Sequence, residues 1–149
     1  MSLLVDTSVW SLALRRDVEQ SAPEVVALRH ALLGADQVFT TGFVLQELLQ
    51  GFAGPKDRAQ LVERLSALAF LQPAKEDHIQ AADVRNTCRR RGVQVGTIDA
   101  LLIQLCRRND LTLLTTDQDF HAATKHVDFR LWISGSGIQA MELRVMVNP

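Results

Sequence analysis

The chain of 149 residues has little cysteine, no tyrosine and no strong excess of either charge. Its two cysteines, Cys88 and Cys106, form no closely spaced pair. We expect neither a disulfide nor a zinc site, and interpret both as core residues in a reducing compartment. The 16 basic and 17 acidic side chains nearly cancel, so bulk charge does not indicate a nucleic-acid binder. Aromatic residues make up 5%, too few to indicate a platform for stacking bases.

Long apolar runs are also missing. The apolar start of the chain lacks a basic region and is interrupted by Asp6, so we predict no signal peptide. No window reaches about 18 uninterrupted apolar residues, which argues against a membrane span and favours a soluble, cytoplasmic protein. Hydrophobic residues are nevertheless abundant, at 47%, on a length that suits one domain with a buried core.

Short apolar runs alternate with helical patterns over residues 1–133. Strands are predicted at 2–5, 37–40, 70–73 (an edge strand, because Pro73 stops it), 111–116 and 129–133. Helices are predicted at 9–15, 21–33, 42–52, 57–68, 76–91, 97–106 (capped by Thr97) and 118–125. Such alternation predicts an α/β fold in which helices cover both faces of a central parallel sheet, giving three layers.

The last residues follow a different pattern. Ser134 begins a Ser-Gly-Ser-Gly sequence typical of a linker, and apolar residues alternate with other residues over 141–147. We therefore divide the chain into a domain at 1–133 and a C-terminal extension at 134–149. The extension has no assigned role; a sheet edge, a dimer contact and a mobile tail all fit its pattern.

Four acidic residues occupy positions that suggest a shared site. Asp6 and Asp117 each follow a predicted strand directly, and the carboxyl ends of parallel strands share one edge of a sheet. Asp99 lies in the first turn of a helix, where the dipole favours an anion. Glu47 lies within a helix whose neighbouring side chains are partly apolar.

Each acid also has a plainer interpretation on its own. Asp6 and Asp117 suit helix caps, Asp99 suits a first turn, and Glu47 suits a side chain tilted to water or paired with an arginine. Converging carboxylates would repel each other, by roughly 4 kcal/mol for two that are about 4 Å apart at an effective dielectric near 20. A hard divalent ion relieves that repulsion, so we expect magnesium or manganese and not zinc.

Four sequence segments together resemble the PIN-domain nucleases, and within them the VapC-type toxins of bacterial toxin–antitoxin pairs. The segments are LLVDTSVW, LQELLQG, GTIDALLIQLC and LLTTDQDF, in that order, and the resemblance runs from Leu3 to about Trp132. It implies a PIN-like fold and an endoribonuclease that uses Mg²⁺, with Mn²⁺ able to substitute. It also implies an RNA substrate, a cognate antitoxin and a homodimer. The extension after Ser134 departs from the family pattern.

The resemblance implies roles for individual residues. The catalytic and metal-binding acids would be Asp6, Glu47, Asp99 and Asp117, with Asp119 as a rival metal ligand for the fourth position. Hydroxyl groups that orient carboxylates or phosphate would come from Thr7, Ser8 and Thr116. A basic stretch would hold the RNA backbone, or else form an ordinary solvated helix end: Arg85, Arg89, Arg90 and Arg91.

Two other functions remain open at this point. Asp6 after a strand also fits the nucleophile of a phosphoaspartyl phosphatase, although those enzymes usually have a second aspartate where this chain has Ser8. The second alternative is a PIN-like RNA-binding or interaction module that does not cleave. The apolar segments 25–33 and 61–70 suit a dimer face, an antitoxin groove or the core.

Overall fold

The computed structural model describes residues 1–15 and 20–134 of the chain. In that part, the strands are β1 (Ser2–Val5), β2 (Gln37–Thr41), β3 (Ala69–Leu71), β4 (Thr112–Leu114) and β5 (Arg130–Leu131). The helices are α1 (Thr7–Leu14), α2 (Pro23–Leu33), α3 (Gly42–Gly51), α4 (Pro55–Ser66), α5 (Lys75–Arg90), α6 (Thr97–Asn109) and α7 (Gln118–Ala123). None of these helices is long and apolar enough to cross a membrane.

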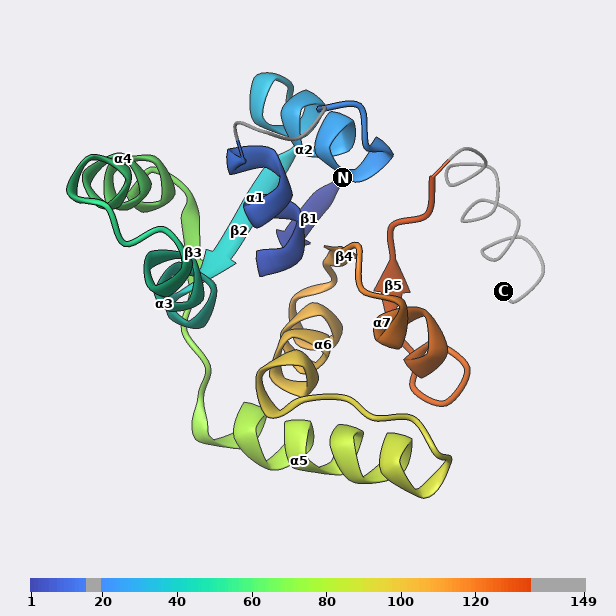
Figure 1. Ribbon diagram of the computed structural model, residues 1–149. Helices are drawn as coiled ribbons and strands as arrows, with labels where there is room; N and C mark the ends of the chain where they lie inside the picture. Colours follow the sequence, from blue (N-terminus) through green and yellow to red (C-terminus); the bar gives the residue numbers. More distant parts are fainter. Residues whose placement is uncertain (16–19, 135–149) are drawn as a thin grey trace.

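The five strands form one parallel sheet in the order β3-β2-β1-β4-β5. The chain moves outward from β1 to β3 and then returns past β1 to β4, so the strand order reverses between β1 and β4 (Figure 1). Helices flank the sheet, which confirms the predicted three-layer α/β arrangement and the edge position of β3. Ligand sites of such sheets lie at the carboxyl ends of the strands beside this reversal.

The core centres on the two middle strands and on α6. Leu4, Val5, Leu113 and Leu114 are completely buried, as central parallel strands covered on both faces require. Helix α6 contributes an unbroken buried run over 100–106, and burial of such apolar surface stabilises a fold by about 25 cal/mol per Å². Both cysteines are buried and free, as predicted.

The predicted cap of α6 is wrong. Gly96 is the N-cap and Thr97 is already the first helical residue, with no side-chain hydrogen bond at the cap. The carboxylate of Asp99, at the third helical position, accepts the Gly96 backbone N–H instead. The acid that we placed in the first turn therefore also satisfies the start of its helix.

Strand β4 is shorter than predicted because the backbone beyond it has other partners. The Thr116 N–H donates to Ser8 Oγ at 3.1 Å, and the Asp117 N–H donates to Thr115 Oγ1 at 3.0 Å. The chain thus leaves the sheet after Leu114 and turns towards the end of β1. Strand β5 is also short, and the extension that we predicted beyond Ser134 lies outside the described residues.

Helix α5 is fastened to α6 by a buried carboxylate, Asp77. Its Oδ1 accepts Arg108 Nε at 2.8 Å and Gln104 Nε2 at 3.4 Å, and its Oδ2 accepts the Ala74 N–H at 2.8 Å. Arg108 is on the basic end of α6, yet it is committed to this pair. The contact sets the position of α5 relative to Asp99, the one acidic residue on α6.

Candidate active site

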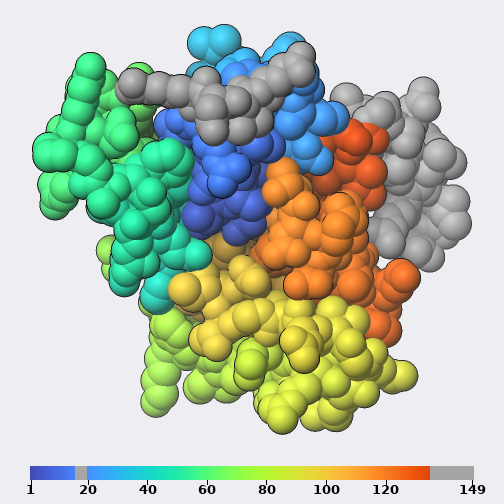
Figure 2. Space-filling view, in the orientation of Figure 1, coloured from blue at the N-terminus to red at the C-terminus, as the bar shows by residue number. Residues whose placement is uncertain are grey.

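Four different segments carry the four predicted acids to one place. Asp6 follows β1 and begins α1, Glu47 lies within α3, Asp99 lies in the first turn of α6, and Asp117 follows β4 and begins α7. The Asp6 N–H donates to Leu114 O at 2.9 Å, which joins the ends of the two central strands. In Figure 2 these segments, coloured dark blue, teal, gold and orange, meet on one face of the molecule.

The pKa of Asp99 shows that the charges of the other three acids act on it. Burial raises this pKa from 3.8 to about 6, with further contributions from the charges of Asp6, Asp117 and Glu47, while the hydrogen bond from Gly96 opposes the shift. Burial and the charge of Asp6 also raise the pKa of Glu47, against the hydrogen bond from Thr7. The fold thus brings Asp6, Glu47, Asp99 and Asp117 into one acidic centre, the name used for these four residues below.

The carboxylate of Asp6 is held by two hydroxyl groups. Its Oδ2 accepts Ser8 Oγ at 2.7 Å and Thr115 Oγ1 at 2.9 Å, and the side chain makes no cap hydrogen bond to α1. Among the described residues, Oδ1 accepts no hydrogen bond, so this oxygen is available to a ligand. Asp6 is 7% exposed, and such a buried carboxylate needs partners.

Thr115 was missed by the sequence analysis, which singled out Thr116. The Thr115 hydroxyl contacts both Asp6 and Asp117, whereas Thr116 contributes its backbone N–H to Ser8. The available signal was position: Thr115 is the first polar residue after the apolar end of β4, a strand that pairs with β1. Thr7 is placed as expected near an acid, and donates to Glu47 Oε1 at 3.4 Å.

The structure separates Asp117 from its rival Asp119. Asp117 raises the pKa of Asp99, and its Oδ1 accepts the Asp119 backbone N–H at 2.9 Å as the cap of α7. Asp119 instead lines a hollow of about 530 Å³ with Arg85 and Arg89. The plainer interpretation of Asp117 as a helix cap is correct, and the charge of the same side chain also acts on Asp99.

A hard divalent cation fits the donors that the acidic centre offers. All four side chains supply oxygen, and their mutual repulsion is the electrostatic condition that a cation relieves. Across residues 1–15 and 20–134, no group of three or more His, Cys, Asp or Glu side chains lies close enough to form a ready ligand set. The fit therefore depends on donor chemistry and shared charge.

Asp99→Asn should raise the stability of the metal-free protein at about pH 7, by about 1–2 kcal/mol, because the variant removes a charge that the fold disfavours. A raised carboxyl pKa means that the folded state binds a proton more readily than the unfolded state. The cost of the wild-type charge consequently appears as the pH rises from 3.8 to about 6. Urea unfolding in EDTA at about pH 7 and at about pH 4, above and near the lower end of this window, measures the difference.

The matched control for this measurement is Asp128→Asn, at an exposed position before β5. Equal stability of wild type and Asp99→Asn at about pH 7 would contradict the claim that the negative charge of Asp99 destabilises the folded state. A stability gain that persists unchanged at about pH 4 would do the same, since Asp99 is mostly protonated there.

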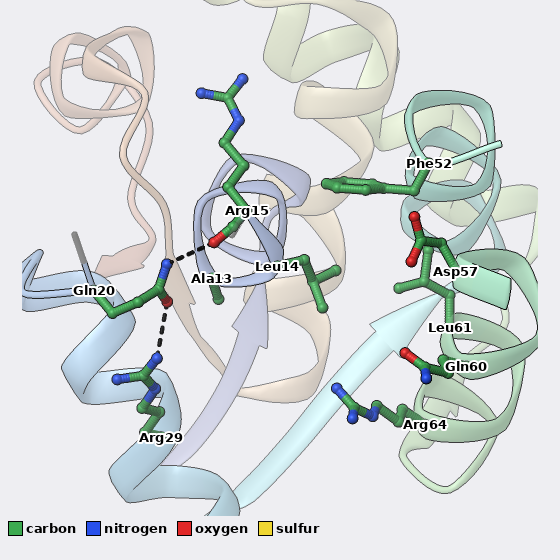
Figure 3. Close-up of a pocket in the computed structure, with 10 residues that line it drawn as sticks. All are labelled: Ala13, Leu14, Arg15, Gln20, Arg29, Phe52, Asp57, Gln60, Leu61 and Arg64. Carbon is green, nitrogen blue, oxygen red and sulfur yellow. Dashed lines mark hydrogen bonds between the residues drawn. The ribbon is translucent and has the colours of Figure 1, made fainter. Parts of the chain in front are cut away.

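A second hollow, of about 450 Å³, lies between α1, α2 and α4 (Figure 3). Apolar side chains, three arginines and one acid, Asp57, line it. Gln20 bridges two of the arginines: its Nε2 donates to Arg15 O at 3.0 Å, and its Oε1 accepts Arg29 at 2.8 Å. Leu61 and Arg64 of α4 form the opposite wall. Parts of both predicted apolar segments therefore border a surface hollow, while Val25, Leu28 and Leu65 are buried in the core.

A strand reversal with converging carboxylates defines a class of α/β protein with an acidic site at its strand ends. The PIN domain model matches residues 3–126. Ribonuclease VapC23 of Mycobacterium tuberculosis is 31% identical over 117 residues, which cover 76% of this chain and 90% of that protein. The chain therefore belongs to the PIN-domain family, as its motifs predicted.

Solved structures share the fold at lower sequence identity. FitAcB from Neisseria gonorrhoeae matches with a TM-score of 0.63 at 22% identity, covering 87% of this chain and 95% of that one. VapBC2 from Rickettsia felis, bound to a DNA fragment from their promoter, has a TM-score of 0.66 at 17% identity, with coverage of 88% and 97%. VapC20 of M. tuberculosis, a toxin that cleaves the sarcin-ricin loop, has a TM-score of 0.63 at 22% identity, with coverage of 86% and 98%.

Proposed function

We propose that this protein is a divalent-metal-dependent endoribonuclease, and the toxin of a toxin–antitoxin pair. The observation that carries the proposal is the acidic centre, in which three other carboxylates raise the pKa of Asp99. The similarity to Ribonuclease VapC23 supports RNA as the substrate. Mg²⁺ is the proposed ion, since oxygen donors favour it, and Mn²⁺ is expected to substitute.

The residues of the acidic centre would divide the work. Asp6, whose Oδ2 is held by two hydroxyls, would offer Oδ1 to the ion. Asp99, from α6, and Asp117, from the segment after β4, would contribute further negative charge. Glu47, whose pKa is raised, would ligate the ion or accept the proton of the attacking water. A bound divalent ion supplies an acidified water and neutralises charge on the phosphoryl oxygens.

Asp117 is proposed as the fourth acid in preference to Asp119. Its charge contributes to the raised pKa of Asp99, whereas Asp119 lines the hollow beside the arginines. Thr7 and Ser8 would hold Glu47 and Asp6 in place, together with Thr115. The phosphatase alternative is less well supported, because Ser8 is occupied in binding the very carboxylate that would have to act as nucleophile.

Incubation of the purified chain with labelled RNA tests this function. Cleavage is expected with Mg²⁺ or Mn²⁺ and should stop in EDTA. The resemblance to PIN-domain nucleases implies product ends with a 5′-phosphate and a 3′-hydroxyl. Cleavage that continues in EDTA would contradict a metal-dependent site. RNA that stays intact with either ion would favour the binding module, and phosphate trapped covalently on the protein would favour the phosphatase.

The proposed partner is a small antitoxin, and the proposed assembly is a homodimer within the complex. Solved neighbours named VapBC2 and FitAcB support a bound partner, and the hollow in Figure 3 is the proposed docking surface. Three arginines outnumber the one acid, Asp57, in its lining, so together with Leu61 they suit a partner segment with acidic and apolar side chains. Calorimetry with the product of a short neighbouring reading frame, and with an Arg64→Glu variant, tests this surface; unchanged binding by the variant would exclude it.

A further inference from the structure

The hollow lined by Arg85 and Arg89 adjoins the acidic centre directly. Its wall includes Gly96, whose N–H hydrogen-bonds the Asp99 carboxylate, and Asp119, whose N–H donates to Asp117. A ligand in this hollow would therefore lie next to the acids without replacing them. Its volume of about 530 Å³ is within the range of roughly 300–1,000 Å³ typical of small-ligand pockets.

The structure divides the basic stretch of α5 into two pairs. Arg85 and Arg89 are one helical turn apart, so they share a face, and both line the hollow. Arg90 ends the helix and Arg91 is its C-cap; neither lines the hollow, although all four arginines are exposed. Four arginines that the sequence presents as one cluster thus serve two different surfaces.

The Arg85 side chain is held in place by one hydrogen bond, while its other guanidinium N–H groups stay available to a ligand. Its Nε donates to Val95 O at 3.1 Å, across the loop between α5 and α6. Within the described residues, no carboxylate pairs with Arg85 or Arg89, so their remaining guanidinium N–H groups can donate to a ligand. A pinned guanidinium loses little side-chain freedom on binding, which favours recognition of phosphate oxygens.

We propose that Arg85 and Arg89 form a phosphate-binding subsite, on one side of the acidic centre, for the backbone of a single-stranded RNA. The subsite orients the strand so that a neighbouring phosphodiester reaches the acids, and it rests on the proposed function only for the identity of that substrate. Asp119 supplies a negative charge in the lining of the hollow, and its repulsion keeps the bound phosphate close to the two arginines. Arg90 and Arg91 make no contribution beyond general charge.

RNA binding by matched charge variants tests the subsite. The probe is a short fluorescein-labelled single-stranded RNA, titrated in Mg²⁺ with full-length protein in an Asp6→Asn background, and gels verify that the RNA stays intact. Arg85→Gln with Arg89→Gln should weaken binding by at least about tenfold. The plot of log K against log salt should become less steep by about 1.4 for two lost contacts.

The control pair, Arg90→Gln with Arg91→Gln, removes the same charge at the C-terminal end of the same helix and should change affinity by less than about twofold. Asp119→Asn should tighten binding by about two- to threefold, because it removes the repulsion that the bound phosphate meets. Arg89→Gln alone guards against a folding effect of changing Arg85, because the Arg89 side chain has no hydrogen bond to lose among the described residues. Thermal melting of every variant completes the controls.

Equal weakening by the two arginine pairs would overturn the subsite, as would unchanged binding by the Arg85 and Arg89 variants, weaker binding by Asp119→Asn, or no measurable binding of RNA. Failure of the proposed function is a separate result. If the wild-type chain cleaves no RNA while the variants bind in the expected order, the subsite stands and the chain is a binding module. If the wild type cleaves and the variants all bind alike, only the subsite fails.

Discussion

Asp6→Asn is expected to slow metal-dependent RNA cleavage by at least about 100-fold while the fold stays intact. The asparagine side chain keeps the size of Asp6, and its amide oxygen can still accept the hydroxyls of Ser8 and Thr115. What it loses is the negative charge that a divalent ion requires. Cleavage rates over a series of Mg²⁺ concentrations, with circular dichroism and thermal melting, measure both parts of this result.

Asp128→Asn is the control for Asp6→Asn. It makes the same chemical change at an exposed residue just before β5, on the side of the sheet where the strands begin, and should leave the rate unchanged. Wild-type cleavage by Asp6→Asn would remove the basis for the acidic centre as the active site. A loss of rate that excess Mg²⁺ fully restores would instead assign Asp6 to ion affinity.

Asp77→Ala is expected to destabilise the protein by about 2–3 kcal/mol, enough to lower the melting temperature by roughly 5–10 °C. The side chain of Asp77 is 1% exposed, and it joins the start of α5 to Gln104 and Arg108 of α6. The variant leaves the buried Gln104 with one partner fewer. Arg108 is 45% exposed and can turn to water, which limits the cost.

The effect of Asp77→Ala should depend on pH. Burial alone would raise the pKa of Asp77, but hydrogen bonds from Ala74 and Gln104 and the charge of Arg108 lower it below its ordinary value of 3.8. A lowered pKa contributes stability above 3.8 that is lost as the pH falls through the folded value, so wild type and variant should converge in acid. Urea unfolding near pH 7 and near pH 3 checks this, with Asp83→Ala, exposed on the same helix, as control. An unchanged midpoint near pH 7 would refute a structural role for Asp77.

Local patterns were sufficient for most of the fold. Buried strands can be recognised in the sequence as apolar runs, such as residues 2–5. An acid that directly follows such a run lies at the carboxyl edge of a parallel sheet. The location of Asp6 and Asp117 at the carboxyl edge of the sheet was therefore predictable from their positions in the sequence alone. Glu47 and Asp99 were weaker predictions, because a helix pattern says which face is apolar but not which strand end the face meets.

Contacts between distant segments were beyond the reach of such patterns. The use of Thr115 in place of Thr116 depends on which hydroxyl faces Ser8, 107 residues away in the chain. The assignment of Thr97 as a cap failed for a local reason: the helix begins one residue earlier, with Gly96 as N-cap, and the Asp99 carboxylate accepts the Gly96 backbone N–H. The pairing of Arg108 with Asp77 likewise requires that α5 lie against α6.

By itself, the sequence determined the alternation of strands and helices and the presence of acids at two strand ends, because both follow from residue spacing along the chain. Only the tertiary structure decided that Asp117 and not Asp119 joins the acidic centre, and that Arg85 and Arg89 share a hollow from which Arg90 and Arg91 are excluded. Residues one or two positions apart point in different directions on a helix or turn. Their surroundings are set by whatever packs against each face, and that information lies elsewhere in the chain.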